Sequence, residues 1–79
     1  MEVNIIRHLG VISERTYKSE VRRKEVNIVS WNGREPKVDI REWDENHEIA
    51  GKGLTLTKQE EMELCSILHE HLKGANNVD

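Results

Sequence analysis

Two segments that alternate apolar and polar residues, one on each side of an Asn-Gly pair, constrain the fold more than any other feature of this sequence. The first covers residues 24–31, the second covers residues 37–43, and Asn32-Gly33 lies between them. Such alternation is typical of strands with one buried face, and Asn-Gly is a strong hairpin signal. Pro36 has no N–H for a ladder, so it must belong to the turn. The two segments are therefore predicted to pair antiparallel.

The predicted hairpin sorts its side chains onto two faces. The apolar face, expected to cover the core, carries Val26, Ile28, Val38 and Ile40. The other face mixes two tryptophans with polar and charged residues: Asn27, Val29, Trp31, Lys37, Asp39, Arg41 and Trp43. Aromatic rings between cations suit single-stranded nucleic acid, because bases stack on indoles and Lys or Arg neutralises phosphates. A second packed layer is the alternative, with Trp31 in the core and Trp43 at a dimer contact.

The rest of the chain predicts two more strands and one helix. Residues 3–13 are rich in Val and Ile and predict a strand, whose apolar pairs Ile5-Ile6 and Val11-Ile12 indicate either burial on both faces or a bulge near Gly10. Residues 15–23 predict a long polar hairpin connection, with Tyr17 exposed or capping it. A polar loop is expected at 44–50, then a flexible basic turn at Gly51-Lys52-Gly53 and a short strand at 54–56.

The helix is predicted to begin at Thr57 and to end before Gly74. Thr57 and Glu60 have the spacing of a capping box, and Gly is favoured just after a helix. Its apolar stripe consists of Met62, Leu64, Cys65, Ile67, Leu68 and Leu72. The fold class is therefore α+β, four antiparallel strands followed by a C-terminal helix, with one domain over residues 1–74 and a C-terminal tail over 75–79.

Composition points to a small domain that shares its core with a second copy. Leu, Ile and Val account for 20 of the 79 residues, Phe is absent, and the single cysteine excludes an internal disulfide. Small domains with so few apolar residues are often stabilised by oligomerisation. Residues 1–41 carry nine Lys and Arg against six acids, whereas residues 42–79 carry three against nine. A local basic face can bind a polyanion even on an acidic protein.

The sequence gives little support for a catalytic site or a metal site. Cys65 and His69 are four residues apart on the helix, but neither CxxC nor HExxH occurs, so Cys65 is expected to pack and the histidines to be solvated. Asp39 and Glu42 fall on opposite strand faces, and no Ser/His/acid order indicates a triad. We expect no enzyme activity, no catalytic residue, no metal and no cofactor. Without a signal peptide or an apolar span, we expect a cytoplasmic protein.

Three motifs together resemble a known family. They are KEVNIVSWNG at 24–33, KVDIREW at 37–43 and GKGLTLT at 51–57. With the terminal helix, they resemble the positive cofactor 4 family of transcriptional coactivators, in its bacterial YdbC-like branch, over residues 3–74. The resemblance implies a curved four-stranded sheet followed by a helix, and a homodimer built largely by the helices. It also implies sequence-tolerant binding of single-stranded DNA in transcription regulation, replication or repair, near the nucleoid, without a cofactor.

The resemblance also assigns candidate positions. Trp31, Arg34, Arg41 and Lys52 match aromatic or basic positions of the family, and Trp43 matches a stacking aromatic displaced by one residue. Asn27 and Val29 replace more polar or basic residues, so the groove is expected to rely more on stacking. The candidate DNA-binding residues are Trp31, Arg34, Lys37, Arg41, Trp43 and Lys52. A protein–protein adaptor in transcription and an RNA-binding module are the alternative functions.

Overall fold

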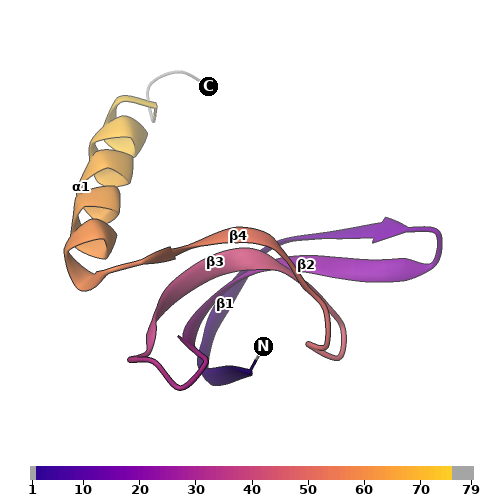
Figure 1. The fold of residues 1–79 in the computed structure, drawn as a ribbon. Helices are drawn as coiled ribbons and strands as arrows, with labels where there is room; N and C mark the ends of the chain where they lie inside the picture. Colours follow the sequence, from indigo (N-terminus) through magenta and orange to yellow (C-terminus); the bar gives the residue numbers. More distant parts are fainter. Residues whose placement is uncertain (1, 76–79) are drawn as a thin grey trace.

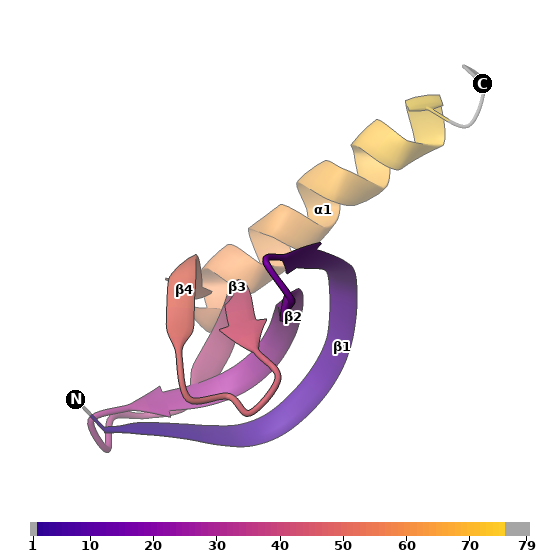
Figure 2. The same ribbon diagram turned by 90° about the vertical axis from the view of Figure 1, so that its right-hand side faces the viewer.

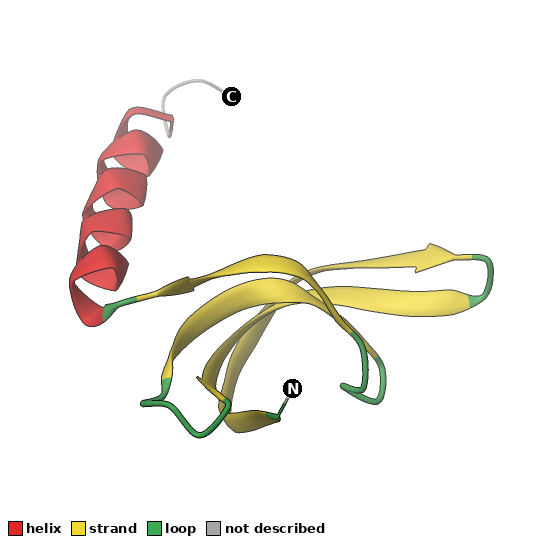
Figure 3. Ribbon diagram, viewed as in Figure 1, coloured by secondary structure: helices red, strands yellow, loops and turns green. Residues whose placement is uncertain are grey.

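The computed structural model describes residues 2–75 and contains one antiparallel sheet followed by one helix (Figures 1 and 3). The strands are β1 (Val3–Tyr17), β2 (Glu20–Trp31), β3 (Lys37–Asp44) and β4 (Ala50–Leu56), and the helix is α1 (Lys58–Ala75). Within the sheet the strands lie in sequence order, β1-β2-β3-β4, so every connection is a hairpin. The predicted fold class, four antiparallel strands and a C-terminal helix, is confirmed.

The sheet is strongly curved, and β1 has the longest arc (Figure 2). The register of β1 against β2 shifts between Ile5 and Arg7, between His8 and Gly10, and between Val11 and Ser13. Bulges of this kind bend a strand and increase its local twist. Of the two alternatives for this strand, the bulge near Gly10 is therefore confirmed, whereas Ile6, Val11 and Ile12 are about half exposed. We call the inside of the curve the concave face and the outside the convex face.

The prediction of which face is buried is wrong for this chain. Among residues 2–75 the fully buried apolar side chains are Val29 and Trp43, which lie on the face expected to be open to nucleic acid. Val26, Ile28, Val38 and Ile40, the expected core face, are only half-buried. Curvature brings side chains on the concave face together and spreads those on the convex face, which the first turn of α1 covers only in part.

The connection between β1 and β2 is a tight turn and not the long polar connection predicted for residues 15–23. Strand β1 ends at Tyr17 and β2 begins at Glu20. Lys18 and Ser19 form the turn between them, and their φ angles of 50° and 67° suit a two-residue hairpin turn. Charged pairs stabilise this polar ladder: Arg23 Nε donates to Glu14 at 2.6 Å across it. Tyr17 is exposed, as expected. In this polar part of the hairpin, charge pairs between the two strands stabilise the pairing in place of an apolar face.

The predicted turn at Gly51-Lys52-Gly53 is also wrong, because these residues belong to β4. Gly53 pairs with Arg41 of β3, and a Cβ at Gly53 would overlap the Arg41 side chain and the Ile40 carbonyl. Glycine therefore lets β4 approach β3 closely at a bulge. By contrast, the turn at Asn32-Gly33 forms as predicted, with φ angles of 52° and 73°.

The capping box of α1 is confirmed. The Glu60 N–H donates to Thr57 Oγ1 at 3.2 Å, and the Thr57 N–H donates to Glu60 Oε1 at 2.8 Å. The helix continues to Ala75, so Gly74 lies inside its last turn and does not follow its end as predicted. Of the tail predicted at 75–79, Ala75 belongs to α1 and residues 76–79 lie outside the described part of the chain.

Beyond its first turn, α1 extends away from the sheet (Figure 1), and most of its apolar stripe is exposed. Met62 is 57% exposed, Leu68 48% and Leu72 56%. Cys65 is exposed as well, so the expectation that it packs is wrong for the single chain. In the part of the chain that the structure describes, no helix has the length and apolar character needed to cross a membrane.

Candidate nucleic-acid interface

Two adjoining hollows surround Trp31, one of about 350 Å³ and one of about 220 Å³. Both are lined by Trp31, Arg34 and Thr55, while Arg41 borders the larger and Lys37 the smaller. Strands β2, β3 and β4 and the β2–β3 turn all contribute to this region. Four of the six candidate residues therefore lie together, at what we call the Trp31 end of the concave face.

Arg41 supports the indole of Trp31. Its guanidinium carbon lies 4.6 Å from the Trp31 ring centroid, within the range of a cation–π contact. The same guanidinium donates to both Asp39 oxygens, at 2.7 and 2.8 Å, and to the Gly51 carbonyl at 3.0 Å. Arg41 is thus fixed in position by β3 and β4, and one side of the indole rests on it.

Asp39 is the buried partner that holds Arg41. It is 0% exposed, and it accepts a third hydrogen bond from Thr55 Oγ1 at 2.8 Å. A buried carboxylate is stable only when it is paired and hydrogen-bonded, and Asp39 meets both conditions. Because Asp39 neutralises Arg41, the positive charge that the Trp31 end offers to a ligand comes from the exposed residues Arg34 and Lys37.

Trp43 does not join this region. It is 2% exposed and packs against the His47 ring, with the two ring centroids 5.7 Å apart. An indole buried in this way has no face available for a base. Its position at the floor of the concave face agrees with the alternative that one tryptophan belongs to the core. That alternative, however, placed Trp31 in the core and Trp43 at a dimer contact.

Lys52 is exposed on β4 and lines neither hollow at Trp31. Its neighbour Gly53 pairs with Arg41, so strand alternation directs Lys52 toward the other face. The flanking glycines are explained by the close approach of β3, which requires no ligand.

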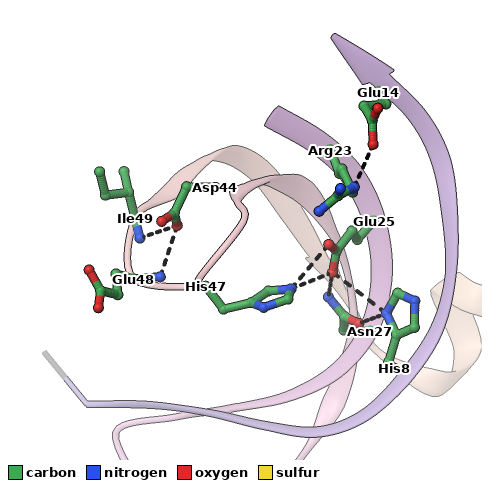
Figure 4. A network of polar contacts seen from close by, with 9 residues as sticks. All are labelled: His8, Glu14, Arg23, Glu25, Asn27, Asp44, His47, Glu48 and Ile49. Atoms are coloured by element: carbon green, nitrogen blue, oxygen red, sulfur yellow. Dashed lines mark hydrogen bonds and ion pairs between the residues drawn. The ribbon is translucent and has the colours of Figure 1, made fainter. Parts of the chain in front are cut away.

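A polar cluster that the sequence analysis did not predict lies at the opposite end of the concave face, which we call the Glu25 end (Figure 4). Asn27 Nδ2 donates to Glu25 Oε1 at 3.0 Å, and His47 Nε2 lies 3.0 Å from both Glu25 oxygens. His8 Nδ1 lies 2.7 Å from Asn27 Oδ1 and 3.5 Å from Glu25 Oε1. The expectation that the histidines are simply solvated is therefore wrong for His8 and His47.

Glu25 is ionised in this cluster despite its burial. Burial by itself raises the pKa of Glu25, but the hydrogen bonds from Asn27 and His47 and the charges of His47 and His8 outweigh it. The pKa of Glu25 therefore lies below its ordinary value. Alternation along β2 places Glu25 and Asn27 on the same face as Trp31, which was the one sequence signal for this cluster.

The turn between β3 and β4 positions His47. The Asp44 carboxylate accepts the Ile49 N–H at 2.7 Å and the Glu48 N–H at 2.8 Å, and His47 has a φ of 56°. The backbone bond from Ile49, opposed by burial and aided by Glu48, lowers the pKa of Asp44. Among residues 2–75, no group of three or more His, Cys, Asp or Glu side chains has the arrangement of a metal site.

Comparison with known proteins gives two matches. The model of the family described as Transcriptional Coactivator p15 (PC4) matches residues 18–67, which include β2, β3, β4 and the first half of α1. The chain is also 44% identical over 45 residues to an uncharacterized protein of Treponema pallidum (strain Nichols). That match covers 57% of this chain and 53% of the relative, so the chain spans about half of the relative's length.

Proposed function

Because the chain belongs to the Transcriptional Coactivator p15 (PC4) family, we propose that it binds single-stranded DNA along the concave face. The observation that carries this proposal is the Trp31 end, where a partly exposed indole rests on Arg41 and borders two hollows that are also lined by Arg34, Lys37 and Glu35. Base stacking on such a ring contributes roughly 1–3 kcal/mol and tolerates any sequence. The protein would act in transcription regulation, replication or repair.

The candidate residues take different roles in this proposal. Trp31 stacks a base, while Arg34 and Lys37 neutralise phosphates at the rim of the hollows. Arg41 holds the indole in place, and its remaining N–H groups can reach a phosphate. Lys52 contributes charge from the outer side of β4. Trp43 shapes the floor of the face, so we withdraw the stacking role that its position in the sequence suggested.

We also propose that the functional form is a homodimer in which α1 packs against a second copy. The support is the apolar stripe of the helix, which the single chain leaves about half exposed at Met62, Leu68 and Leu72. A chain with so small a core gains stability by burying such a stripe. The convex face, half-buried at Val26, Ile28, Val38 and Ile40, is available to extend the interface.

A titration with three nucleic acids tests the binding proposal. Oligo-dT, oligo-rU and duplex DNA are added to the protein at two salt concentrations, and the Trp fluorescence is followed. We expect quenching and tighter binding with oligo-dT than with duplex, because paired bases cannot stack on Trp31. Equal affinity for duplex, or binding without any fluorescence change, would overturn the stacking mode. Tighter binding to oligo-rU would make RNA the ligand.

A further inference from the structure

Two partly exposed imidazoles lie at the Glu25 end of the concave face. His8 comes from β1 and His47 from the β3–β4 turn, and they approach Glu25 from opposite sides (Figure 4). Their side chains are 52% and 39% exposed, whereas the Glu25 side chain is 3% exposed. The proposed function gives these residues no role so far.

The hydrogen bonds fix which nitrogen of each ring carries the inner proton. Asn27 Nδ2 donates to Glu25, so Asn27 Oδ1 is the acceptor that faces His8 Nδ1, and Nδ1 must donate. His47 Nε2 faces both Glu25 oxygens and must donate as well. Within residues 2–75, the second nitrogens, His8 Nε2 and His47 Nδ1, make no hydrogen bond.

Protonation therefore changes the chemistry of the outer nitrogen of each ring. In the neutral ring that nitrogen is a hydrogen-bond acceptor, whereas in the imidazolium form it is a donor. With Glu25 ionised, the cluster has one net positive charge when both rings are protonated and one net negative charge when both are neutral. Only the first state suits a phosphate.

Three charged groups around the cluster are engaged elsewhere, whereas the exposed Glu48 follows His47 directly in the chain. Arg41, opposite Glu25 in the β2–β3 register, is bonded to Asp39. Arg23, two residues earlier on β2, donates to Glu14 of β1. Asp44, at the base of the turn that carries His47, accepts backbone N–H groups. The outer nitrogens of the two imidazoles are therefore the groups that the cluster presents to a ligand.

We propose that His8 and His47 form a second phosphate-binding subsite of the nucleic-acid interface, oriented by Glu25 and Asn27 and active when the imidazoles are protonated. This inference rests on the proposed function. A single strand would extend from the Trp31 end to the Glu25 end, and its binding would be accompanied by proton uptake. By linkage, low pH tightens the binding of the strand to the same extent that the strand favours protonation.

The test measures oligo-dT binding to the full chain at about pH 5.5 and about pH 8, over a range of salt concentrations. We expect affinity to be on the order of tenfold higher at the lower pH. The plot of log K against log salt should also be steeper there by about 1.4, the value for two additional phosphate contacts on a single strand. An abasic strand should show the same pH effect, because the subsite binds phosphate.

Two neutral substitutions isolate the subsite. His8→Asn keeps an N–H donor close to the position of Nδ1, and His47→Gln keeps one close to that of Nε2, so each preserves the inner hydrogen bond. The double variant should match the wild type at pH 8 and lose most of the gain at pH 5.5. Each single variant should lose about half of the extra salt slope, roughly 0.7. His71→Gln, on exposed helix surface, is the matched control.

The outcomes separate this inference from the function on which it rests. A wild type that binds oligo-dT with the same affinity and slope at both pH values overturns the subsite and leaves the proposed function intact. A double variant that keeps the full pH effect, or a His71 variant that loses it, also overturns the subsite. Absence of binding at either pH overturns both proposals.

Discussion

On the concave face, the polar residues Glu25, Asn27 and Asp39 are at most 2% exposed, whereas on α1 the apolar residues Met62 and Leu68 are about half exposed. The concave face can bury these three residues because their side chains have partners: Asp39 accepts three hydrogen bonds, and Glu25 pairs with Asn27 and His47. The apolar stripe has no such compensation within the described chain. The three polar residues are therefore satisfied within the single chain, whereas the apolar stripe stays exposed in it.

The largest effect is expected from a charge on the helix stripe. Leu68→Asp would place an unpaired carboxylate in the proposed dimer interface, where burial of a charge is very costly. We expect a monomeric or unfolded species by light scattering at micromolar concentration. Glu70→Gln on the same helix, where Glu70 pairs with Lys73 at 3.6 Å, should remain dimeric. A wild-type monomer under these conditions would contradict the dimer.

Loss of a carboxylate on the concave face comes next. Asp39→Ala leaves the Arg41 guanidinium without its buried partner, so the free energy of unfolding should fall by about 3–5 kcal/mol. Urea denaturation monitored by circular dichroism measures this. Glu42→Ala is the comparison, because Glu42 pairs with the exposed Arg15 at 2.7 Å and such pairs add little. Equal losses for the two variants would show that the Asp39 network is no stronger than a surface pair.

Substitution of the two tryptophans should have different effects: loss of Trp43 should lower stability, and loss of Trp31 should weaken DNA binding. Trp43→Ala removes a side chain that is 2% exposed, so it should lower the free energy of unfolding by about 3–5 kcal/mol. Trp31→Ala should instead weaken oligo-dT binding by about 1–3 kcal/mol and keep the wild-type salt slope.

Both parameters are measured for both variants, by thermal denaturation and by fluorescence anisotropy of a labelled oligonucleotide. If Trp31→Ala leaves affinity unchanged in a folded protein, the indole is a packing residue. If Trp43→Ala weakens binding with stability unchanged, the conformation that binds DNA must expose Trp43.

The smallest expected effects are changes in the salt dependence of binding. They should differ between the exposed cations Arg34 and Lys37 and the paired cation Arg41. Arg34→Ala and Lys37→Ala should each reduce the slope of log K against log salt by about 0.7, because each removes one phosphate contact. Arg41→Lys should reduce it less, since Asp39 already neutralises that position. The opposite ranking, with the slope most sensitive at Arg41, would mean that DNA displaces Asp39 from the guanidinium.

Local sequence patterns were sufficient to predict the strands around Asn32-Gly33, the capping box at Thr57 and the division of side chains into two faces. These features depend on local rules, because alternation has a period of two and caps and tight turns involve neighbouring residues. For the same reason, alternation alone assigns Trp31 and Arg41 to one face of the hairpin.

Which face is buried, and which residues meet on it, depends instead on the folded chain as a whole. The bulges of β1 shift its register and curve the sheet, so His8 reaches Asn27 across 19 residues and His47 reaches Glu25 across 22. No local pattern encodes such contacts, because the first depends on the register that pairs His8 with Asn27 and the second on how the β3–β4 turn lies against β2. That bend buries Trp43 under His47 and leaves Trp31 on its Arg41 support, although strand alternation places both tryptophans on the same face.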